Sequence, residues 1–529
     1  MRSVPRRAGA VLPVLPVAAV IALLALPVGA GGGRGAGAGP ADAASALVVL
    51  YCAVRLVRER RRPLPRTAAV VFGLPVAGVS LAALGAVSPE AALTGLGRYT
   101  QVFVLVPAAV LLLVRDRRDF RLLAWTFVAL AGWQGAVGVH QYVTGTGASY
   151  RGEDIRAVGT FGAQDVMGMA TVVSLGLVCA VGLALGRDSV RHRAVAIGCA
   201  SLLVVPLAVS FSRGAWIATA LTCAVQLLLA GLRRALKVGA VVVAACGVLV
   251  GGFGVGTAML QERITSITQV TAAPDQSVTD RYTMWAAAVG MWRQHPLTGV
   301  GLKGFPEYRD SHASLALSSG SDTAGAGAAY RRQPLLSPHN MYLLVLAEQG
   351  LLGLLALAGG WLALLACGVR RLRGAVRAGR TGRVRRVRRE EWGPDRGPAH
   401  SPDDRPAGHT HGEGDGRPVG GRGGDLDRGL HRGPANGQSG GPVGHVHREE
   451  DGRPVGGLDC ALVACGLLVW LLVDFAYADI GGPTTVLTAV CLGLAARWAM
   501  AGDAAEVTAR GADRAACTAE GTRAGAGAR

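Results

Sequence analysis

The chain has 529 residues, of which 50% are hydrophobic, and its formal net charge is +19 at pH 7. A soluble domain rarely combines so apolar a composition with so large a charge, whereas a membrane protein with basic loops does so readily. The charge therefore does not indicate a nucleic-acid-binding protein, and no nucleic-acid partner is expected.

Apolar stretches long enough to cross a bilayer as helices, about 20 residues each, recur along the whole chain. Backbone polar groups in lipid must be paired within the segment, so these stretches are predicted to be helical. Twelve spans are predicted, at residues 9–30, 40–57, 67–87, 99–114, 122–140, 166–186, 194–211, 214–232, 238–258, 340–369, 458–477 and 483–500. The predicted fold class is an all-α polytopic membrane protein with a large extracytoplasmic loop between spans 9 and 10.

Arginine-rich loops follow the second, fourth, sixth and eighth spans, and the loops between them contain few Lys or Arg residues. Because basic loops stay on the cytoplasmic side, both termini are predicted to be cytoplasmic, with membrane lipids as partners. The predicted order is as follows: residues 1–258 contain nine spans, residues 259–339 form an extracytoplasmic loop, and residues 340–369 form the tenth span. Residues 370–457 form an insert, residues 458–500 contain the last two spans, and residues 501–529 form a cytoplasmic tail.

The cytoplasmic insert is rich in Gly, Arg, Pro, Asp and His, and it repeats DGRPVGG at 415–421 and 451–457. Its apolar content is too low for a hydrophobic core, which predicts a disordered basic segment. Its arginines could contact anionic lipid. Its histidines could bind a metal, but their spacing is typical of biased composition, so no metal site is predicted. These histidines are His400, His409, His411, His431, His445 and His447.

A helix is predicted in the extracytoplasmic loop, over about 278–294. Ser277 and Asp280 resemble a capping box, and Pro296 ends the helix near Gln294. The apolar stripe comprises Trp285, Ala288, Val289 and Trp292. Such a helix would lie on the outer membrane surface or cap the bundle. The Gly/Ser/Ala-rich residues 313–329, which come next, are predicted to be mobile.

Residues 299–304 read GVGLKG, which matches the G-x-G-x-x-G dinucleotide fingerprint. That fingerprint requires a preceding strand and a following helix within a βαβ unit, whereas a surface helix and Pro296 precede it here. A nucleotide site is therefore not expected. The glycines at 299, 301 and 304 are predicted to supply positive φ angles and close backbone approach.

Two arginines lie on the predicted outer side, where basic residues are less common. Arg213 stands between spans seven and eight, and Arg281 begins the apolar stripe of the outer helix. Arg213 could be an interfacial side chain, and Arg281 could make a cation–π or capping contact. Alternatively, either could hold a phosphate, whose oxygens a guanidinium binds in a bidentate manner. Gly214 and Ala215 would leave room for a ligand at the backbone.

His339 lies on the same side. Ser337 is predicted to cap the tenth span and Pro338 to be its first residue, so that His339 occupies the first helical turn. The helix dipole disfavours imidazolium there, which leaves a neutral ring able to accept a proton. The alternative is an ordinary interfacial histidine.

Four motifs resemble the signature of the O-antigen ligase and polymerase superfamily. They are RAVGTFGAQDVMG (156–168), SRGAW (212–216), RYTMW with HPLTGVGLKGF (281–305), and PHNMYL with AEQGLLG (338–353). In the first motif, Gln164 and Asp165 replace the usual Pro-Asn of the family.

The resemblance implies a membrane glycosyltransferase that moves a glycan from a polyprenyl-pyrophosphate donor to an acceptor hydroxyl at the outer face of the membrane. It implies an inverting reaction without metal, nucleotide or other cofactor, onto an acceptor glycan, lipid or wall polymer. Arg213 and Arg281 would hold the pyrophosphate, and His339 would act as general base or orient the acceptor. The second-rank substrate-binding candidates are Arg156, Trp285, Asn340 and Glu348.

Three alternatives stay open. Ligation to a different acceptor and polymerisation of like units are not separable from the motifs. A transporter or flippase of lipid-linked glycans would require ionisable residues along a transmembrane path. The predicted spans hold few, among them Glu348 and Asp474. A membrane scaffold acting through the basic insert would not need His339.

Overall fold

The computed structural model describes residues 13–27, 40–59, 64–150, 155–186, 189–240, 276–325, 331–391 and 457–500. The predicted ninth span beyond residue 240, the insert from 392 to 456 with its histidines, and the tail 501–529 lie outside the described residues. The chain divides into two compact units, Val376–Glu450 and the remainder of the chain. The larger unit contains every described helix and strand up to residue 375 and from residue 457 onward.

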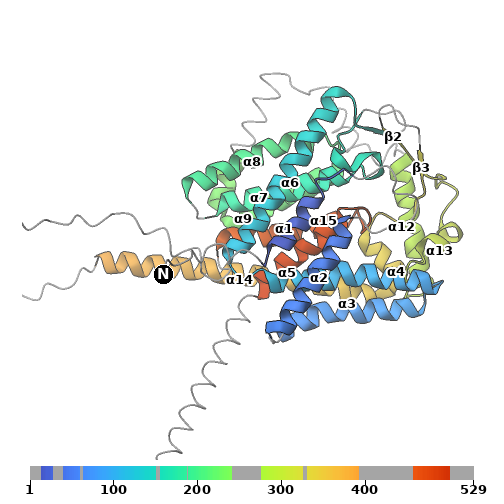
Figure 1. The fold of residues 1–529 in the computed structure, drawn as a ribbon, viewed down its shortest axis with the longest axis horizontal. Coiled ribbons are helices and arrows are strands. Elements are labelled where there is room, and N and C mark those ends of the chain that lie inside the picture. The colour runs from blue at the N-terminus through green and yellow to red at the C-terminus, as the bar shows by residue number, and fades with distance from the viewer. Residues whose placement is uncertain are drawn as a thin grey trace, which may run out of the picture. The chain divides into compact units, whose positions relative to one another are not determined.

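The described residues are mainly helical (Figure 1). The N-terminal helices are α1 (Leu15–Leu23), α2 (Pro40–Glu59), α3 (Arg66–Leu84), α4 (Pro89–Thr100), a π-helical turn Gln101–Leu105, α5 (Val106–Leu113) and α6 (Arg117–Thr144). They are followed by a 3₁₀ segment Gly159–Gln164, α7 (Gly168–Leu185), α8 (Val190–Ala208), α9 (Arg213–Ala230), α12 (Gln276–Gln294), α13 (Phe305–His312), α14 (Met341–Glu391), α15 (Leu458–Asp474) and a helix Thr485–Met500.

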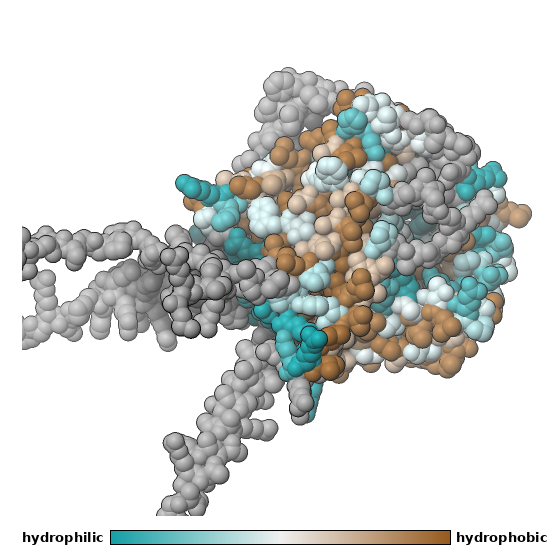
Figure 2. All heavy atoms as spheres, in the orientation of Figure 1, coloured by the Kyte–Doolittle hydropathy of each residue, from teal (hydrophilic) through white to brown (hydrophobic). Residues whose placement is uncertain are grey.

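Eight helices in the described part of the chain are long and apolar enough to cross a membrane. Large apolar side chains are exposed along several of them, for example Leu47 on α2, Val70 on α3 and Leu202 on α8. Figure 2 shows hydrophobic residues spread across much of the visible face. Apolar helices that expose apolar side chains suit a lipid environment, so the chain is a multi-pass membrane protein.

Helix α7 forms the centre of the bundle and packs against α6, α8, α9 and α15. Nearly all of its residues are buried. Small residues allow this close packing: a Cβ on Gly176 would lie 2.2 Å from the Cβ of Ala131 on α6. Among membrane helices, such small-residue contacts permit backbone approach that larger side chains would prevent.

Arginines bond to helix ends at one end of this bundle. Arg193 donates through Nε to the carbonyl oxygen of Ala184 at 3.3 Å, and Arg234 donates through Nη1 to that of Leu185 at 2.8 Å. Both carbonyls belong to the last turn of α7, where cationic side chains stabilise the exposed carbonyl groups. The buried Asp459, near the start of α15, pairs with Arg117 at 3.1 Å. These arginines come from the loops predicted to be cytoplasmic.

A small antiparallel sheet joins segments that are predicted to be extracytoplasmic, although the sequence predicts only helices and a mobile stretch here. Strands β1 (Ala148–Tyr150), β2 (Ser321–Gly325) and β3 (Arg331–Gln333) pair in the order β1-β2-β3. Ala148 lies opposite Gly325, and Asp322 opposite Arg332. The predicted mobile residues 313–329 therefore contain a strand, because backbone pairing with β1 supplies hydrogen bonds that local composition does not reveal.

Helix α12 agrees closely with the predicted bounds, but its contacts differ. Asp280 does not serve a capping box at Ser277, because Gln276 is already helical. Its carboxylate instead accepts hydrogen bonds from the backbone N–H and the hydroxyl of Ser318, at 2.8 and 2.7 Å. The buried side of the helix carries Met284, Ala287, Ala288 and Met291. Of the predicted stripe, only Ala288 is fully buried, so the core-facing side is rotated from the tryptophans.

Helix α14 is broken at Gly350, which has φ of 65° and ψ of −165°, whereas the sequence predicts an uninterrupted span over 340–369. The break exposes backbone groups, and the chain preceding α13 pairs with them. Val300 and Gly301 donate their N–H groups to the carbonyls of Ala347 and Glu348, at 2.8 and 3.1 Å.

The other side of the break is paired in the same way. Leu351 and Leu352 donate to the carbonyls of Pro296 and Leu297, at 2.9 and 3.2 Å. Irregular backbone at membrane depth is tolerated only where protein groups satisfy it. The segment 296–301 therefore stabilises a helix break that lipid alone would disfavour.

Gly350→Ala should destabilise the fold, by at least about 1 kcal/mol for the left-handed backbone alone. An added Cβ would also lie 2.3 Å from the backbone of Leu297. Gly359→Ala is the matched control on the same helix, because a Cβ there meets nothing within 4 Å. Thermal unfolding in detergent measures both variants. Equal unfolding temperatures for the two would contradict the role assigned to the break.

Candidate active site

Arg213 is the first residue of α9, directly after Ser212, whose hydroxyl caps the helix by accepting from Ala215 N–H at 3.3 Å. The sequence suggests that Gly214 leaves room for a ligand, but Tyr477 occupies that space. A Cβ on Gly214 would lie 2.4 Å from a ring carbon of Tyr477, and the tyrosine hydroxyl donates to the Gly214 carbonyl. The turn that carries Arg213 is thus bound to the segment after α15.

Arg281 and Trp285 lie one turn apart on α12 and reach two other segments. Arg281 donates through Nη1 to the carbonyl of Tyr477 at 3.4 Å. Trp285 donates through Nε1 to the carbonyl of Pro338 at 2.8 Å. The half-buried side of α12 therefore faces both the segment after α15 and the residue before His339.

His339 lies outside the helix, in contrast to the prediction that it occupies the first helical turn. Helix α14 begins at Met341, and Asn340 caps it by accepting from Leu343 N–H at 3.0 Å. Ser337 instead donates its hydroxyl to Asp479. His339 has φ of 49°, a left-handed conformation that is uncommon for non-glycine residues and is enriched at functional sites.

The turn after α15, residues 475–479, connects these parts. Met341 N–H lies within hydrogen-bonding distance of the carbonyls of Phe475 and Ala478, at 2.9 and 3.0 Å. The Asn340 side chain donates to the carbonyl of Ala476 at 2.7 Å. The same turn presents the Tyr477 carbonyl to Arg281. It therefore brings α9, α12 and α14 together at the end of the bundle opposite the arginine-bonded helix ends.

Tyr477 and Asp479 are absent from the sequence-based candidates. Their signal was present in LVDFAYADI (472–480), where two acidic residues and a tyrosine follow an apolar span. Hydropathy singles out only Asp474 in this stretch. Asp474 is the last residue of α15, and its backbone carbonyl accepts hydrogen bonds from the N–H groups of Tyr477 and Ala478. Only the folded chain brings Tyr477 and Asp479 to the segments that carry Arg281 and His339.

The electrostatic surroundings of His339 favour the neutral ring. Burial lowers the pKa of His339 below its usual value; Asp479 opposes this shift and Arg281 adds to it. The predicted neutral imidazole is thus supported, but burial is the main cause and the helix dipole is not needed. A neutral ring beside a carboxylate can accept a proton.

Arg156 belongs to a neighbouring loop. Its backbone pairs with Ala148, and the loop is held by two buried or half-buried glutamines of α6. Gln141 accepts from the N–H groups of Val158 and Gly159, and Gln134 accepts from Thr160 N–H at 2.9 Å.

Asp165 follows in the same loop. Burial raises its pKa to about 6. Its carboxylate lies next to Gly482, where an added Cβ would be 2.8 Å from Oδ2. The loop thereby reaches the chain beyond α15 as well.

Glu348 contacts the glycine-rich turn. Its Oε1 accepts from Phe305 N–H at 3.3 Å, and the side chain is buried. Within GVGLKG, Gly299 and Gly301 have positive φ as predicted, but Gly304 does not, and Lys303 does. The prediction of a positive φ at Gly304 is wrong because the turn reverses one residue earlier. The predicted close backbone approach holds there, since a Cβ on Gly304 would lie 2.9 Å from the Gly301 carbonyl oxygen.

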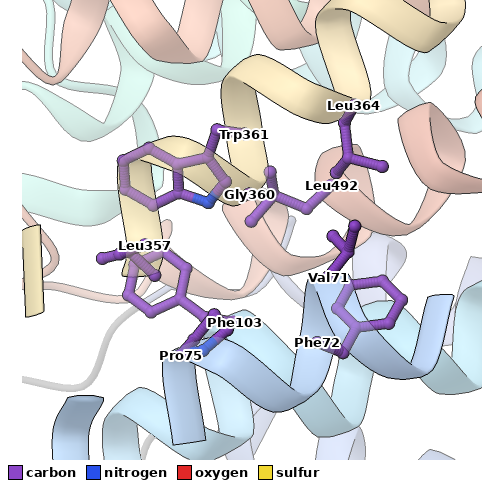
Figure 3. Close-up of a pocket in the computed structure, with 9 residues that line it drawn as sticks. All are labelled: Val71, Phe72, Pro75, Phe103, Leu357, Gly360, Trp361, Leu364 and Leu492. Carbon is purple, nitrogen blue, oxygen red and sulfur yellow. The ribbon is translucent and has the colours of Figure 1, made fainter. Parts of the chain in front are cut away.

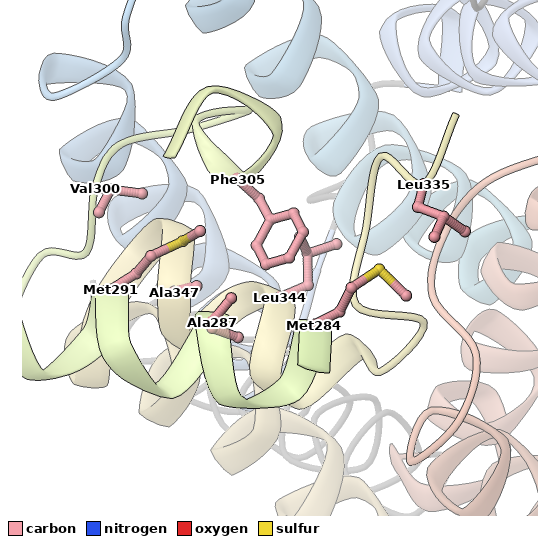
Figure 4. Packing of buried hydrophobic residues seen from close by; sticks show 9 residues of the cluster. Met284, Ala287, Met291, Val300, Phe305, Leu335, Leu344 and Ala347 are labelled. Carbon is pink, nitrogen blue, oxygen red and sulfur yellow. The ribbon is translucent and has the colours of Figure 1, made fainter. Parts of the chain in front are cut away.

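An apolar cluster fixes α12 to the start of α14 (Figure 4). Met284 and Met291 of α12 pack with Phe305 of α13 and with Leu344 and Ala347 of α14. The sequence predicts that α12 lies on the membrane surface or caps the bundle, and this packing matches a helix that caps the bundle. It also fixes the helix that carries Arg281 against the start of α14.

A small apolar cavity lies elsewhere, between α3, α14 and the last helix (Figure 3). It is lined by residues such as Phe72, Phe103 and Leu364, and its volume is about 10 Å³. That space is close to the minimum for one water molecule. Trp361 connects it to the site through a ring contact with Phe475, with centroids 5.0 Å apart. The cavity is therefore a packing feature.

Residues 198–358 match the family model described as O-Antigen ligase. This part of the chain is similar to the O-antigen ligase family. The match confirms the resemblance seen in the sequence motifs and supports a membrane glycan ligase or polymerase family, which acts on lipid-linked glycans. Arg213, Arg281 and His339 lie within the matched residues of this O-antigen ligase domain, whereas Tyr477 and Asp479 lie beyond it. No curated protein matches the chain.

Asn340→Ala should destabilise the fold by about 2 kcal/mol, about 1 for the helix cap and about 1 for the hydrogen bond to Ala476. Ser88→Ala is the matched control, because Ser88 caps α4 by accepting from Ala91 N–H. It should cost about 1 kcal/mol. Chemical denaturation in micelles measures both. Equal losses would show that the bond to the turn contributes nothing.

Proposed function

We propose that the chain is an inverting glycosyltransferase that moves a glycan from a polyprenyl-pyrophosphate donor to an acceptor hydroxyl at the outer face of a bacterial inner membrane. The observation that carries the proposal is that Arg281 and the segments carrying Arg213 and His339 converge on the single turn 475–479. An O-antigen ligase domain supports the class of reaction.

The proposed roles of the arginines follow from charge. When the glycan leaves, negative charge develops on the departing lipid pyrophosphate. Arg213 and Arg281, on two different helices, would stabilise that charge from fixed positions. Guanidinium groups can supply the positive charge that a divalent cation supplies in other transferases, so the proposed reaction uses no metal.

His339 is proposed as the general base. Its neutral ring would take the proton of the acceptor hydroxyl while the acceptor oxygen attacks the sugar carbon bonded to the pyrophosphate. One displacement from the face opposite the leaving group inverts that carbon. Asp479, which favours the imidazolium, would stabilise His339 once it holds the proton.

The second-rank residues are proposed to shape the site. Trp285 and Asn340 hold the segment around His339 through Pro338 and Ala476. Glu348 positions the turn before α13, and Arg156 would contact the donor from the neighbouring loop.

The proposed topology has twelve spans with both termini in the cytoplasm. In support, the site lies at the opposite end of α7, α9 and α15 from the arginines that bond helix ends. A transporter is less well supported. Of the buried carboxylates among the described residues, Asp42, Asp119 and Asp459 lie in the first turn of their helices, and Glu348 lies at the break in α14. The other two, Asp280 and Asp322, lie in α12 and β2.

His339→Gln should lower transfer by roughly 10²- to 10⁴-fold, the range expected for loss of a general base. The assay uses purified protein in vesicles, a polyprenyl-pyrophosphate oligosaccharide and candidate acceptors, without metal or energy source. His312→Gln on α13 is the control.

Arg281→Gln should be equally impaired in transfer, and Arg293→Gln on the same helix should not be impaired. Undiminished transfer by His339→Gln would refute the mechanism, while product length separates polymerase from ligase.

The pH dependence of kcat/KM should shift in opposite directions in two variants. Asp479 raises the pKa of His339, so Asp479→Asn lowers it further and moves the acid limb to lower pH. Arg281 lowers that pKa, so the residual activity of Arg281→Gln should show its acid limb at higher pH. Arg281→Lys keeps the charge and should leave the limb nearly in place. Shifts in the same direction for both variants would contradict His339 as the titrating base.

A further inference from the structure

Tyr282 and Trp285 form an aromatic pair on α12 that the hydrophobic core does not use. Their ring centroids are 5.5 Å apart with an interplanar angle of 82°. Tyr282 is 50% exposed and Trp285 is half-buried, whereas the core side of α12 carries Met284 and Met291. An aromatic pair left at the surface beside a catalytic segment is available to bind a ligand.

Hydrogen bonds fix this pair beside the proposed reacting groups. The only donor of Trp285, its indole N–H, is bound to the carbonyl of Pro338, which directly precedes His339. Arg281, adjacent to Tyr282, is bound to the Tyr477 carbonyl. The orientation of the indole is thus set by the segment that carries the proposed base, and its ring is left for apolar contact.

We propose that Tyr282 and Trp285 form a stacking subsite for the sugar ring that is bonded to the pyrophosphate of the donor. This inference rests on the proposed function. Arg281 would hold the pyrophosphate, and Tyr282 is the next residue in the chain. The first sugar of the donor, which is bonded to that pyrophosphate, would therefore lie close to the Tyr282 ring. The face of an aromatic ring carries partial negative charge, which suits the C–H groups on the apolar face of a pyranose.

The competing role is a membrane anchor, since Tyr and Trp also gather at membrane–water interfaces. The two roles differ in what they bind. A stacking subsite recognises the glycan, whereas an anchor stabilises the protein in lipid whichever ligand is present.

The test compares equilibrium binding of two ligands to protein in vesicles, namely the polyprenyl-pyrophosphate oligosaccharide and the same lipid pyrophosphate without sugar. Tyr282→Leu should weaken binding of the oligosaccharide-bearing lipid by about three- to tenfold and leave the bare lipid unchanged. Tyr282→Phe keeps the ring and should bind both as the native protein does. Tyr308→Leu, at a residue 39% exposed on α13, is the matched control.

Kinetics separate this inference from the proposed function. Tyr282→Leu should raise KM for the donor with kcat within about twofold, because no reacting group is lost. Equal weakening of both lipids, an unchanged donor KM, or a rise only in the acceptor KM would overturn the subsite. If Tyr282→Leu fails to fold, Tyr282→Gln is compared with Tyr282→Phe in the same assays. Failure of native protein to transfer any glycan would instead refute the proposed function.

Discussion

The hydrogen-bonded turn after α15 is the interaction on which the rest of the site depends. Its carbonyls accept from Met341, Asn340 and Arg281, and the Tyr477 hydroxyl reaches the start of α9. Backbone carbonyls at a helix C-terminus need donors, and in a membrane protein water is scarce as a donor. The turn meets that need with groups from three helices, and in doing so holds the proposed catalytic residues together.

A second constraint acts on the neighbouring helix. The break at Gly350 leaves carbonyl and amide groups unpaired, and the segment 296–301 pairs with them. The glycines at 299 and 301 permit that approach: a Cβ on Gly299 would lie 2.5 Å from the Ala347 carbonyl oxygen. The glycine pattern that resembles a nucleotide fingerprint therefore serves backbone pairing at a helix break. This docking, with the apolar cluster around Met284, positions Arg281.

Local rules predicted local features well. The length of the apolar stretches predicted most helices, and helical periodicity predicted α12 almost to the residue, because a helix needs only its own backbone partners. Motifs identified Arg213, Arg281 and His339 as candidates. The same rules misassigned the start of α14, because Ser337 bonds to Asp479 and Asn340 is the cap instead. A side chain can cap a helix only if it does not bond elsewhere, and Ser337 bonds to Asp479, which is 142 residues away in the chain.

The sequence by itself determined that this is a helical membrane protein with an O-antigen ligase-like segment, and which arginines and histidine that segment contributes. Hydropathy and short motifs carry that information because each is contained in consecutive residues. Only the tertiary structure decided that Tyr477 and Asp479 belong to the proposed site, that Gly214 is covered by a tyrosine ring, and that α14 is broken and repaired by another segment. Those outcomes depend on long-range hydrogen bonds and packing, and the partners in such contacts cannot be predicted from a local sequence pattern.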